Sequence, residues 1–67
     1  MTAREMLRKL GYENSDTGIS TFQRDFNRLG GQALLVTGQL DEETSEALRF
    51  AHASGQVFTI VRDRQGA

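Results

Sequence analysis

A stripe of apolar residues in the first half of the chain constrains the fold more than any other feature. The stripe recurs at spacings of three, four and three residues: Ile19, Phe22, Phe26 and Leu29. These spacings place the side chains on one side of an α-helix, while polar and charged residues fill the other sides. The pair Gly30-Gly31 follows directly and is a signal for a helix end. We therefore expect an amphipathic helix over residues 19–29.

The core that this helix faces must come from helix packing. The chain has 67 residues and no cysteine, so neither disulfides nor thiolate–metal sites can stabilise it. A domain of this size buries only about 60% of the surface that its unfolded chain exposes. The one histidine, His52, has no neighbours at zinc-ligand spacing. We expect a small all-α domain that holds no metal and no cofactor.

A short helix is also expected near the N-terminus. Thr2 and Glu5 have the spacing of a capping box, in which each side chain binds the backbone amide of the other residue. Apolar residues at helical spacing continue to Leu10, and Gly11 follows as a helix-ending residue. The pattern predicts a helix over residues 3–10 that is stable only when it packs against the rest of the chain.

A further helix is expected after Asp41, which is a favourable N-cap residue. Glu42 and Glu43 follow in the first turn, where the helix dipole favours negative charge. The apolar face continues through residues that we expect to be buried: Ala47, Leu48, Phe50 and Ala51. This helix is expected to run to Ala53. In the turn before it, Gly38 is expected to take a backbone conformation that residues with a Cβ avoid.

Two short segments outside the helices have the composition of extended chain. Residues 33–36 form a brief apolar run that is too short for a stable helix. Residues 57–61 are β-branched and aromatic, which favours a strand, and residues 62–67 form a polar tail. We therefore expect a three-helix domain over residues 1–55, followed by an extended or strand-like tail over residues 56–67.

The order of these elements resembles the peptidoglycan-binding-like domain, a small three-helix module attached to many bacterial and phage cell-wall hydrolases. The matching positions lie within residues 3–53: Leu10-Gly11-Tyr12, Phe22-Gln23, Leu29-Gly30, Val36-Thr37-Gly38, Leu40-Asp41, Thr44 and Ala47-Leu48. The resemblance implies a three-helix bundle with a shallow surface groove and no catalysis of its own. The prodomains of matrix metalloproteases share this fold, but their inhibitory chemistry needs a cysteine, which this chain lacks.

The chain departs from the family pattern in three places. The third helix of the family often ends in a second Phe-Gln pair, whereas this chain has Phe50-Ala51-His52. The loop over residues 30–35 is longer or more apolar than is common in the family. The strand-like segment over residues 57–61 lies outside the resemblance altogether.

The first functional hypothesis is a non-catalytic module that binds peptidoglycan or muropeptides. The candidate ligand-binding residues are Tyr12, Gln23, Arg24, Asn27, Arg28 and Gln39. The two arginines can bind stem-peptide carboxylates with their planar donor forks, and the amide side chains can pair with amides of the polymer. The alternative for Tyr12 is a place at the rim of the core. The alternative for each of the others is a solvated helix face.

The second hypothesis is a protein–protein adaptor within a larger assembly, such as a phage tail-like particle or an envelope complex. The segment over residues 57–61 would then add as a strand to a sheet of the partner. A protein that only binds cell wall has no use for such a strand, so this segment distinguishes the two hypotheses.

Other classes of function are disfavoured. The formal net charge is -1, and the helix expected after Asp41 carries several acids, whereas a nucleic-acid reader needs a concentrated basic surface. No nucleophile stands beside an evident base, and the acids over residues 41–43 match a helix-capping pattern. We therefore expect that the protein is not an enzyme and that nucleic acid is not among its partners.

The sequence also bears on location. No apolar run approaches the roughly 18 residues that would suggest a transmembrane helix, and the N-terminus lacks the apolar segment of a signal peptide. We expect no membrane partner and a place in the cytoplasm or in a phage-like particle. The cell envelope is the expected location if the chain is a trimmed fragment.

Overall fold

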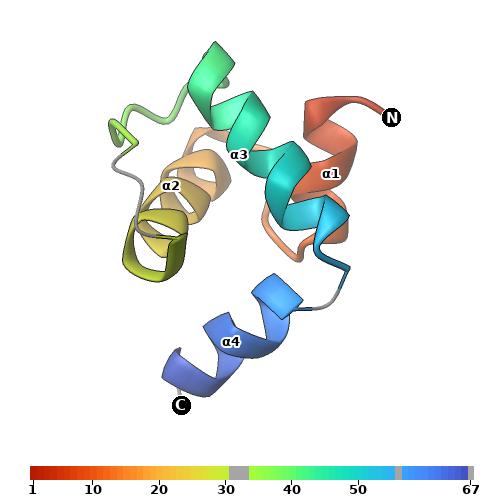
Figure 1. Ribbon diagram of the computed structural model, residues 1–67. Coiled ribbons are helices and arrows are strands. Elements are labelled where there is room, and N and C mark those ends of the chain that lie inside the picture. The colour runs from red at the N-terminus through yellow and green to blue at the C-terminus, as the bar shows by residue number, and fades with distance from the viewer. Residues whose placement is uncertain (31–33, 56, 67) are drawn as a thin grey trace.

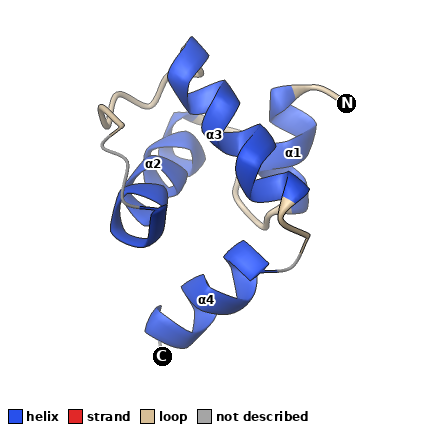
Figure 2. Ribbon diagram, in the orientation of Figure 1, coloured by secondary structure: helices blue, strands red, loops and turns tan. Residues whose placement is uncertain are grey.

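A computed structural model of the chain describes residues 1–30, 34–55 and 57–66, which contain helices and no strand. The helices are α1 (Ala3–Lys9), α2 (Asp16–Gly30), α3 (Glu42–Ala53) and α4 (Val57–Gly66) (Figure 1). The described residues between the helices form loops and turns, which are tan in Figure 2. The prediction of an all-α fold is confirmed for these residues. The expectation of three helices misses α4, which packs on α2 and α3.

The core lies where the four helices meet. Its centre is formed by side chains that are almost completely buried: Leu7, Ile19, Phe22 and Leu48. The ring of Phe22 meets Tyr12 edge-on at 5.6 Å and stacks on Phe58 at 5.7 Å between ring centroids. Aromatic pairs at such separations contribute about 1 kcal/mol beyond the burial of their surface. The apolar stripe of α2 therefore faces the core, as its spacing predicts.

The N-terminal capping box of α1 forms as predicted. The hydroxyl of Thr2 accepts a hydrogen bond from the backbone N–H of Glu5 at 3.2 Å, and the Glu5 side chain accepts one from the backbone N–H of Thr2 at 3.4 Å. These two bonds satisfy amides that the helix itself leaves without an acceptor. Helix α1 ends at Lys9, one residue earlier than the pattern indicates.

Helix α2 begins at Asp16, earlier than the predicted start at residue 19. The hydroxyl of Ser15 accepts a hydrogen bond from the backbone N–H of Gly18 at 3.2 Å, as an N-cap does. Gly18 therefore lies inside the first turn. A Cβ at this position would lie 1.7 Å from the carbonyl oxygen of Glu13, so the preceding loop can fold back on α2 only because residue 18 has no side chain.

The start of α3 also follows the prediction. The Asp41 carboxylate accepts a hydrogen bond from the backbone N–H of Thr44 at 2.8 Å. Gly38 has a φ of 75°, in the left-handed region that favours glycine. This turn sets the direction in which α3 leaves the loop.

Phe50 does not lie in the core, so that prediction is wrong. Phe50 is 69% exposed, and its ring makes an edge contact with Phe26 at 6.4 Å between centroids. The buried stripe of α3 consists of Thr44, Ala47, Leu48 and Ala51. Phe50 is displaced around the helix from this stripe, since each residue advances about 100°.

The C-terminal segment is a helix, so the prediction of a strand-like tail over residues 57–61 is wrong. Phe58 is buried against Phe22 and Phe26, and Arg62 contacts the end of α1. Residues 58 and 62 lie about 6 Å apart along a helix axis, against about 13 Å along a strand. In a helix, therefore, Phe58 can contact α2 while Arg62 contacts the end of α1. This packing overrides the β-propensity of the segment.

The apolar segment after α2 is bound to that helix at Leu34. Leu34 is buried, and residues 34–36 have no helical or strand structure. The side chain of Asn27 accepts from the Leu34 N–H and donates to the Leu34 carbonyl at 2.8 Å. Both backbone groups of Leu34 are therefore bound to α2. The rest of the predicted run, Ala33, lies outside the described residues.

Candidate functional site

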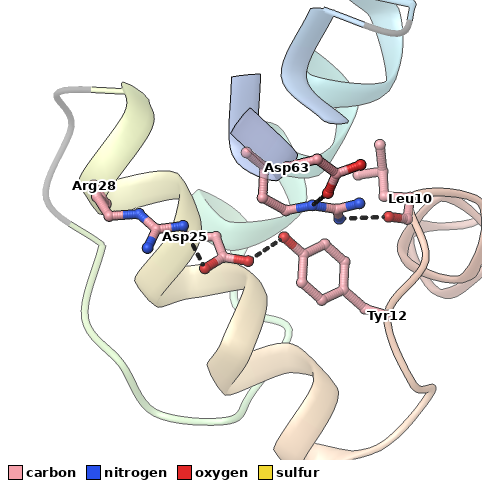
Figure 3. Close-up of polar contacts among 6 residues, drawn as sticks. Leu10, Tyr12, Asp25, Arg28 and Asp63 are labelled. Atoms are coloured by element: carbon pink, nitrogen blue, oxygen red, sulfur yellow. Dashed lines mark hydrogen bonds and ion pairs between the residues drawn. The ribbon is translucent and has the colours of Figure 1, made fainter. Parts of the chain in front are cut away.

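The side chain of Asp25 on α2 joins two of the candidate residues, Tyr12 and Arg28. The Tyr12 hydroxyl donates a hydrogen bond to Asp25 Oδ2 at 2.6 Å, and Arg28 Nη2 lies 3.4 Å from Asp25 Oδ1 (Figure 3). The side chain of Arg28 is 49% exposed, against 18% for Asp25. Asp25 therefore contacts the arginine from the more buried side, and about half of the Arg28 side chain remains exposed.

Tyr12 supports this arrangement from the rim of the core. It is buried, and its ring contacts Phe22. Burial, together with the hydrogen bond to Asp25, raises the pKa of the Tyr12 phenol above its usual range. The phenol therefore keeps its proton at physiological pH and donates a hydrogen bond to Asp25. Tyr12 therefore lies at the rim of the core, with its hydroxyl bonded to Asp25.

Arg62 of α4 also contacts Tyr12. Its guanidinium carbon lies 5.1 Å from the centre of the Tyr12 ring, within the range of a cation–π contact. Its Nη1 donates to the Leu10 carbonyl at 2.7 Å, and its Nε donates to Asp63 at 3.1 Å (Figure 3). This arginine was not foreseen as part of a site, because a strand-like tail gave no reason to place it beside Tyr12.

Arg24 lies on α2 one turn before Arg28 and is exposed. Residues four apart on a helix are surface neighbours, with Cβ atoms about 6 Å apart. The structure therefore places the two predicted arginines on neighbouring positions of one outer face. A pair of guanidinium groups at this spacing can bind one or two carboxylates of an extended ligand.

Gln23 lies inside the protein and has no exposed surface. Its Oε1 accepts from the backbone N–H groups of Thr37 and Gly38 at 2.9 and 3.1 Å, and its Nε2 donates to the Thr44 hydroxyl at 2.9 Å. The side chain therefore joins α2 to the turn before α3 and to α3 itself. In this structure it offers no surface to a ligand.

The two remaining candidates, Asn27 and Gln39, differ in their surroundings. Asn27 is half-buried and binds both backbone groups of Leu34, so its amide is engaged within the fold. Gln39 is exposed, in the turn whose backbone binds Gln23. Its backbone carbonyl accepts a hydrogen bond from Gln23 Nε2 at 3.3 Å. Within residues 1–30, 34–55 and 57–66, the hydrogen bonds join Tyr12 and Arg28 through Asp25 and place Gln39 in a different group.

The acids around α3 do not gather into a metal site. No three His, Cys, Asp or Glu side chains among the described residues lie close enough together to hold a metal ion. Asp41 is bound to Thr44, and its hydrogen bonds with that residue lower the pKa of the Asp41 carboxyl group.

None of the helices in the described part of the chain is long and apolar enough to cross a bilayer.

An apolar groove between α2, α3 and α4 was missed by the sequence analysis. It has a volume of about 230 Å³, and the side chains that line it are Phe26, Leu29, Phe50, Ala51, Ser54, Val57, Phe58 and Val61. The groove exists because α4 packs as a helix beside α3. The only available signal was the helical spacing of Val57 and Val61, which a strand prediction conceals.

Comparison with known proteins adds no further constraint. The chain matches no family model, no curated protein and no solved structure.

Proposed function

We propose that this protein is a non-catalytic module that binds peptidoglycan through the outer face of α2. Arg24 and Arg28 are the ligand-binding residues, and Asp25 and Tyr12 position Arg28. The single observation that carries the proposal is the pair of exposed arginines one turn apart, one of which contacts Asp25, the carboxylate that accepts a hydrogen bond from the buried Tyr12 phenol. The motif resemblance supplies the class of ligand.

The arrangement of the family-like motifs supports this class. Phe22 fills the core, and the adjacent Gln23 binds Thr37, Gly38 and Thr44. Residues quoted as separate motifs in the sequence therefore meet in one hydrogen-bonded unit. This unit is consistent with motifs that serve folding. It uses the inner side of α2, so the residues on the outer side remain available for a ligand.

The chemistry of the ligand fits two guanidinium groups. Peptidoglycan carries carboxylates on its stem peptides, repeated along a polymer. Arginine binds carboxylates through paired N–H donors, and such charge-assisted hydrogen bonds are stronger than neutral ones. Each exposed pair contributes only about 0–1 kcal/mol because water competes for both partners. Binding by one copy is therefore weak, and presentation of several copies on one body would raise the avidity.

The proposal predicts co-sedimentation with purified insoluble sacculi. The double variant Arg24→Ala/Arg28→Ala should lose at least threefold in pelleted protein at low salt. The control Arg8→Ala/Lys9→Ala removes the same charge from exposed positions on α1 and should pellet like the wild type. Circular dichroism checks that each variant is folded. Wild-type protein that pellets no more than an unrelated small domain would overturn the proposal, as would equal losses in the two double variants.

A further inference from the structure

Tyr12 joins helix α4 to the helix that carries the candidate arginines, α2. It belongs to the loop between α1 and α2, so contacts with neighbouring elements determine where its side chain lies. The guanidinium carbon of Arg62 on α4 lies 5.1 Å from the centre of the Tyr12 ring. The Tyr12 hydroxyl donates a 2.6 Å hydrogen bond to Asp25 on α2 (Figure 3). One side chain therefore contacts α4 through its ring and α2 through its hydroxyl.

Arg62 is itself bound to the protein on two sides. Its Nη1 donates to the Leu10 carbonyl at 2.7 Å, and its Nε donates to Asp63 at 3.1 Å. Its side chain is 19% exposed, against 49% for Arg28. A guanidinium that is mostly covered and bonded to acceptors of its own chain is poorly placed to bind an external polymer. Arg62 is therefore suited to an internal role, in contrast to Arg28.

Helix α4 restrains the Tyr12 ring by two routes. The first is direct, because the Arg62 cation is attracted to the ring face. Its charge also polarises the phenol, since linked polar contacts in a partly buried site strengthen one another. The second route is indirect: Phe58 of α4 stacks on Phe22 at 5.7 Å, and Phe22 meets Tyr12 edge-on at 5.6 Å. The orientation of the Tyr12 hydroxyl therefore depends on the packing of α4.

Tyr12 in turn restrains the carboxylate beside Arg28. Its hydroxyl binds Oδ2 of Asp25, while Arg28 Nη2 lies 3.4 Å from Oδ1 of the same group. The two oxygens belong to one planar carboxylate, so a short hydrogen bond to Oδ2 also fixes the place of Oδ1. An exposed ion pair contributes little, partly because both side chains must be ordered. A carboxylate that is already fixed removes part of this cost, so the Tyr12 hydroxyl helps to order Arg28.

We propose that α4 positions the ligand-binding face of α2 and that Arg62 is the positioning residue through which it acts. Arg62 holds the Tyr12 ring, and the Tyr12 hydroxyl holds Asp25. Asp25 in turn orders Arg28. This series of contacts is a property of the fold, whereas its effect on a ligand rests on the proposed function. Loss of Arg62 weakens the contribution of Arg28 to binding and leaves the contribution of Arg24 unchanged.

The first experiment needs no ligand. A double-mutant cycle in urea compares the unfolding equilibrium constants of Arg62→Ala, Asp25→Ala and the double variant. The two effects should be non-additive by at least about threefold in this constant, because each substitution breaks the same series of contacts. In a Tyr12→Phe background, which lacks only the hydroxyl, the two effects should become additive. Arg64→Ala removes an exposed arginine of the same helix and should be additive with Asp25→Ala in both backgrounds.

Two results of this cycle would overturn the proposal. One is additivity of Arg62→Ala and Asp25→Ala in the wild-type background. The other is non-additivity that persists in the Tyr12→Phe background, because the coupling would then be a direct charge attraction that bypasses the hydroxyl. If Arg62→Ala lacks the helical circular dichroism of the wild type, Arg62→Gln replaces it, since glutamine keeps a donor and loses the charge.

The second experiment measures binding by co-sedimentation with purified insoluble sacculi at low salt. Arg62→Ala should reduce the pelleted protein about twofold in the wild-type background and in the Arg24→Ala background, as expected for the loss of an ordering contact at an exposed ion pair. It should have no further effect in the Arg28→Ala background, where the residue that it positions is absent. Arg64→Ala is the matched control and should pellet like the wild type.

The outcomes separate this inference from the proposed function. An equal loss from Arg62→Ala in the Arg28→Ala background would assign Arg62 a purely structural role and overturn the proposal. A wild type that does not pellet would overturn the proposed function and, with it, the effect on a ligand. The urea cycle would still decide whether α4 is coupled to Asp25.

Discussion

Arg62 donates a 2.7 Å hydrogen bond to the carbonyl oxygen of Leu10, which lies 52 residues earlier in the chain. Leu10 caps the C-terminal end of α1, where helix carbonyls lack intrahelical donors. One side chain of α4 thus satisfies an acceptor at the end of the first helix and covers the ring of Tyr12. The contact therefore fixes α4 to the end of α1.

Replacement of Arg62 by alanine should lower the free energy of unfolding by about 2 kcal/mol. The reason is the loss of a partly buried charged hydrogen bond and of a cation–π contact. The control Arg64→Ala removes the same charge from an exposed position on α4 and should change stability by no more than about 0.5 kcal/mol. Urea denaturation measures both values, and equal effects would contradict a specific role for Arg62.

Two phenylalanines give a matched test of how α4 packs. Phe58→Ala should cost about 3 kcal/mol because it empties a buried position stacked on Phe22 and Phe26. Phe50→Ala removes a ring that is mostly in solvent and should cost less than about 1 kcal/mol. Thermal unfolding at low protein concentration measures the difference. A small effect of Phe58→Ala would mean that α4 is detached in solution.

Gln23→Leu should destabilise the protein by about 2–4 kcal/mol, although leucine is apolar and of similar size. The substitution leaves the backbone N–H groups of Thr37 and Gly38 without their acceptor, and an unsatisfied buried donor costs about 1–3 kcal/mol. Gln39→Leu, in the same turn but exposed, serves as the control. Chemical denaturation that ranks the two variants in the opposite order would contradict the internal role of Gln23.

The lowered pKa of Asp41 predicts a pH dependence of stability. Its carboxyl group binds the Thr44 amide, so the folded state holds the proton less tightly than the unfolded state. The stabilisation is complete above the unfolded pKa of about 3.9 and is lost as the pH falls through the lower folded value. Asp41→Asn keeps a capping oxygen without this titration. The advantage of the wild type in melting temperature at pH 7 should therefore shrink by pH 3, and an advantage that stays constant would refute this assignment.

Local signals in the sequence predicted those parts of the fold that local contacts determine. The Thr2–Glu5 capping box, the Asp41 cap and the turn at Gly38 each depend on residues within a few positions of one another, and each is present. The structure of residues 57–61 depends instead on distant partners of Phe58 and Arg62. No pattern within the segment itself identifies those partners, so intrinsic β-propensity gave the wrong secondary structure.

The candidate site shows the same division. The exposure of Arg24 and Arg28 follows from their places opposite the apolar stripe. The burial of Gln23 also has a local signal, because residue 23 follows Ile19 by four positions and precedes Phe26 by three, which places it on the stripe. The link from Tyr12 through Asp25 to Arg28 had no such signal, since it depends on how the loop after α1 crosses α2.

The position of Phe58 and Arg62 late in the sequence has a consequence for biosynthesis. A ribosome adds residues from the N-terminus, so α1, α2 and α3 emerge before the side chains that cover Phe22 and Phe26 from the α4 side. Until α4 has packed, the chain exposes the side of Phe22 and Phe26 that Phe58 covers in the folded structure.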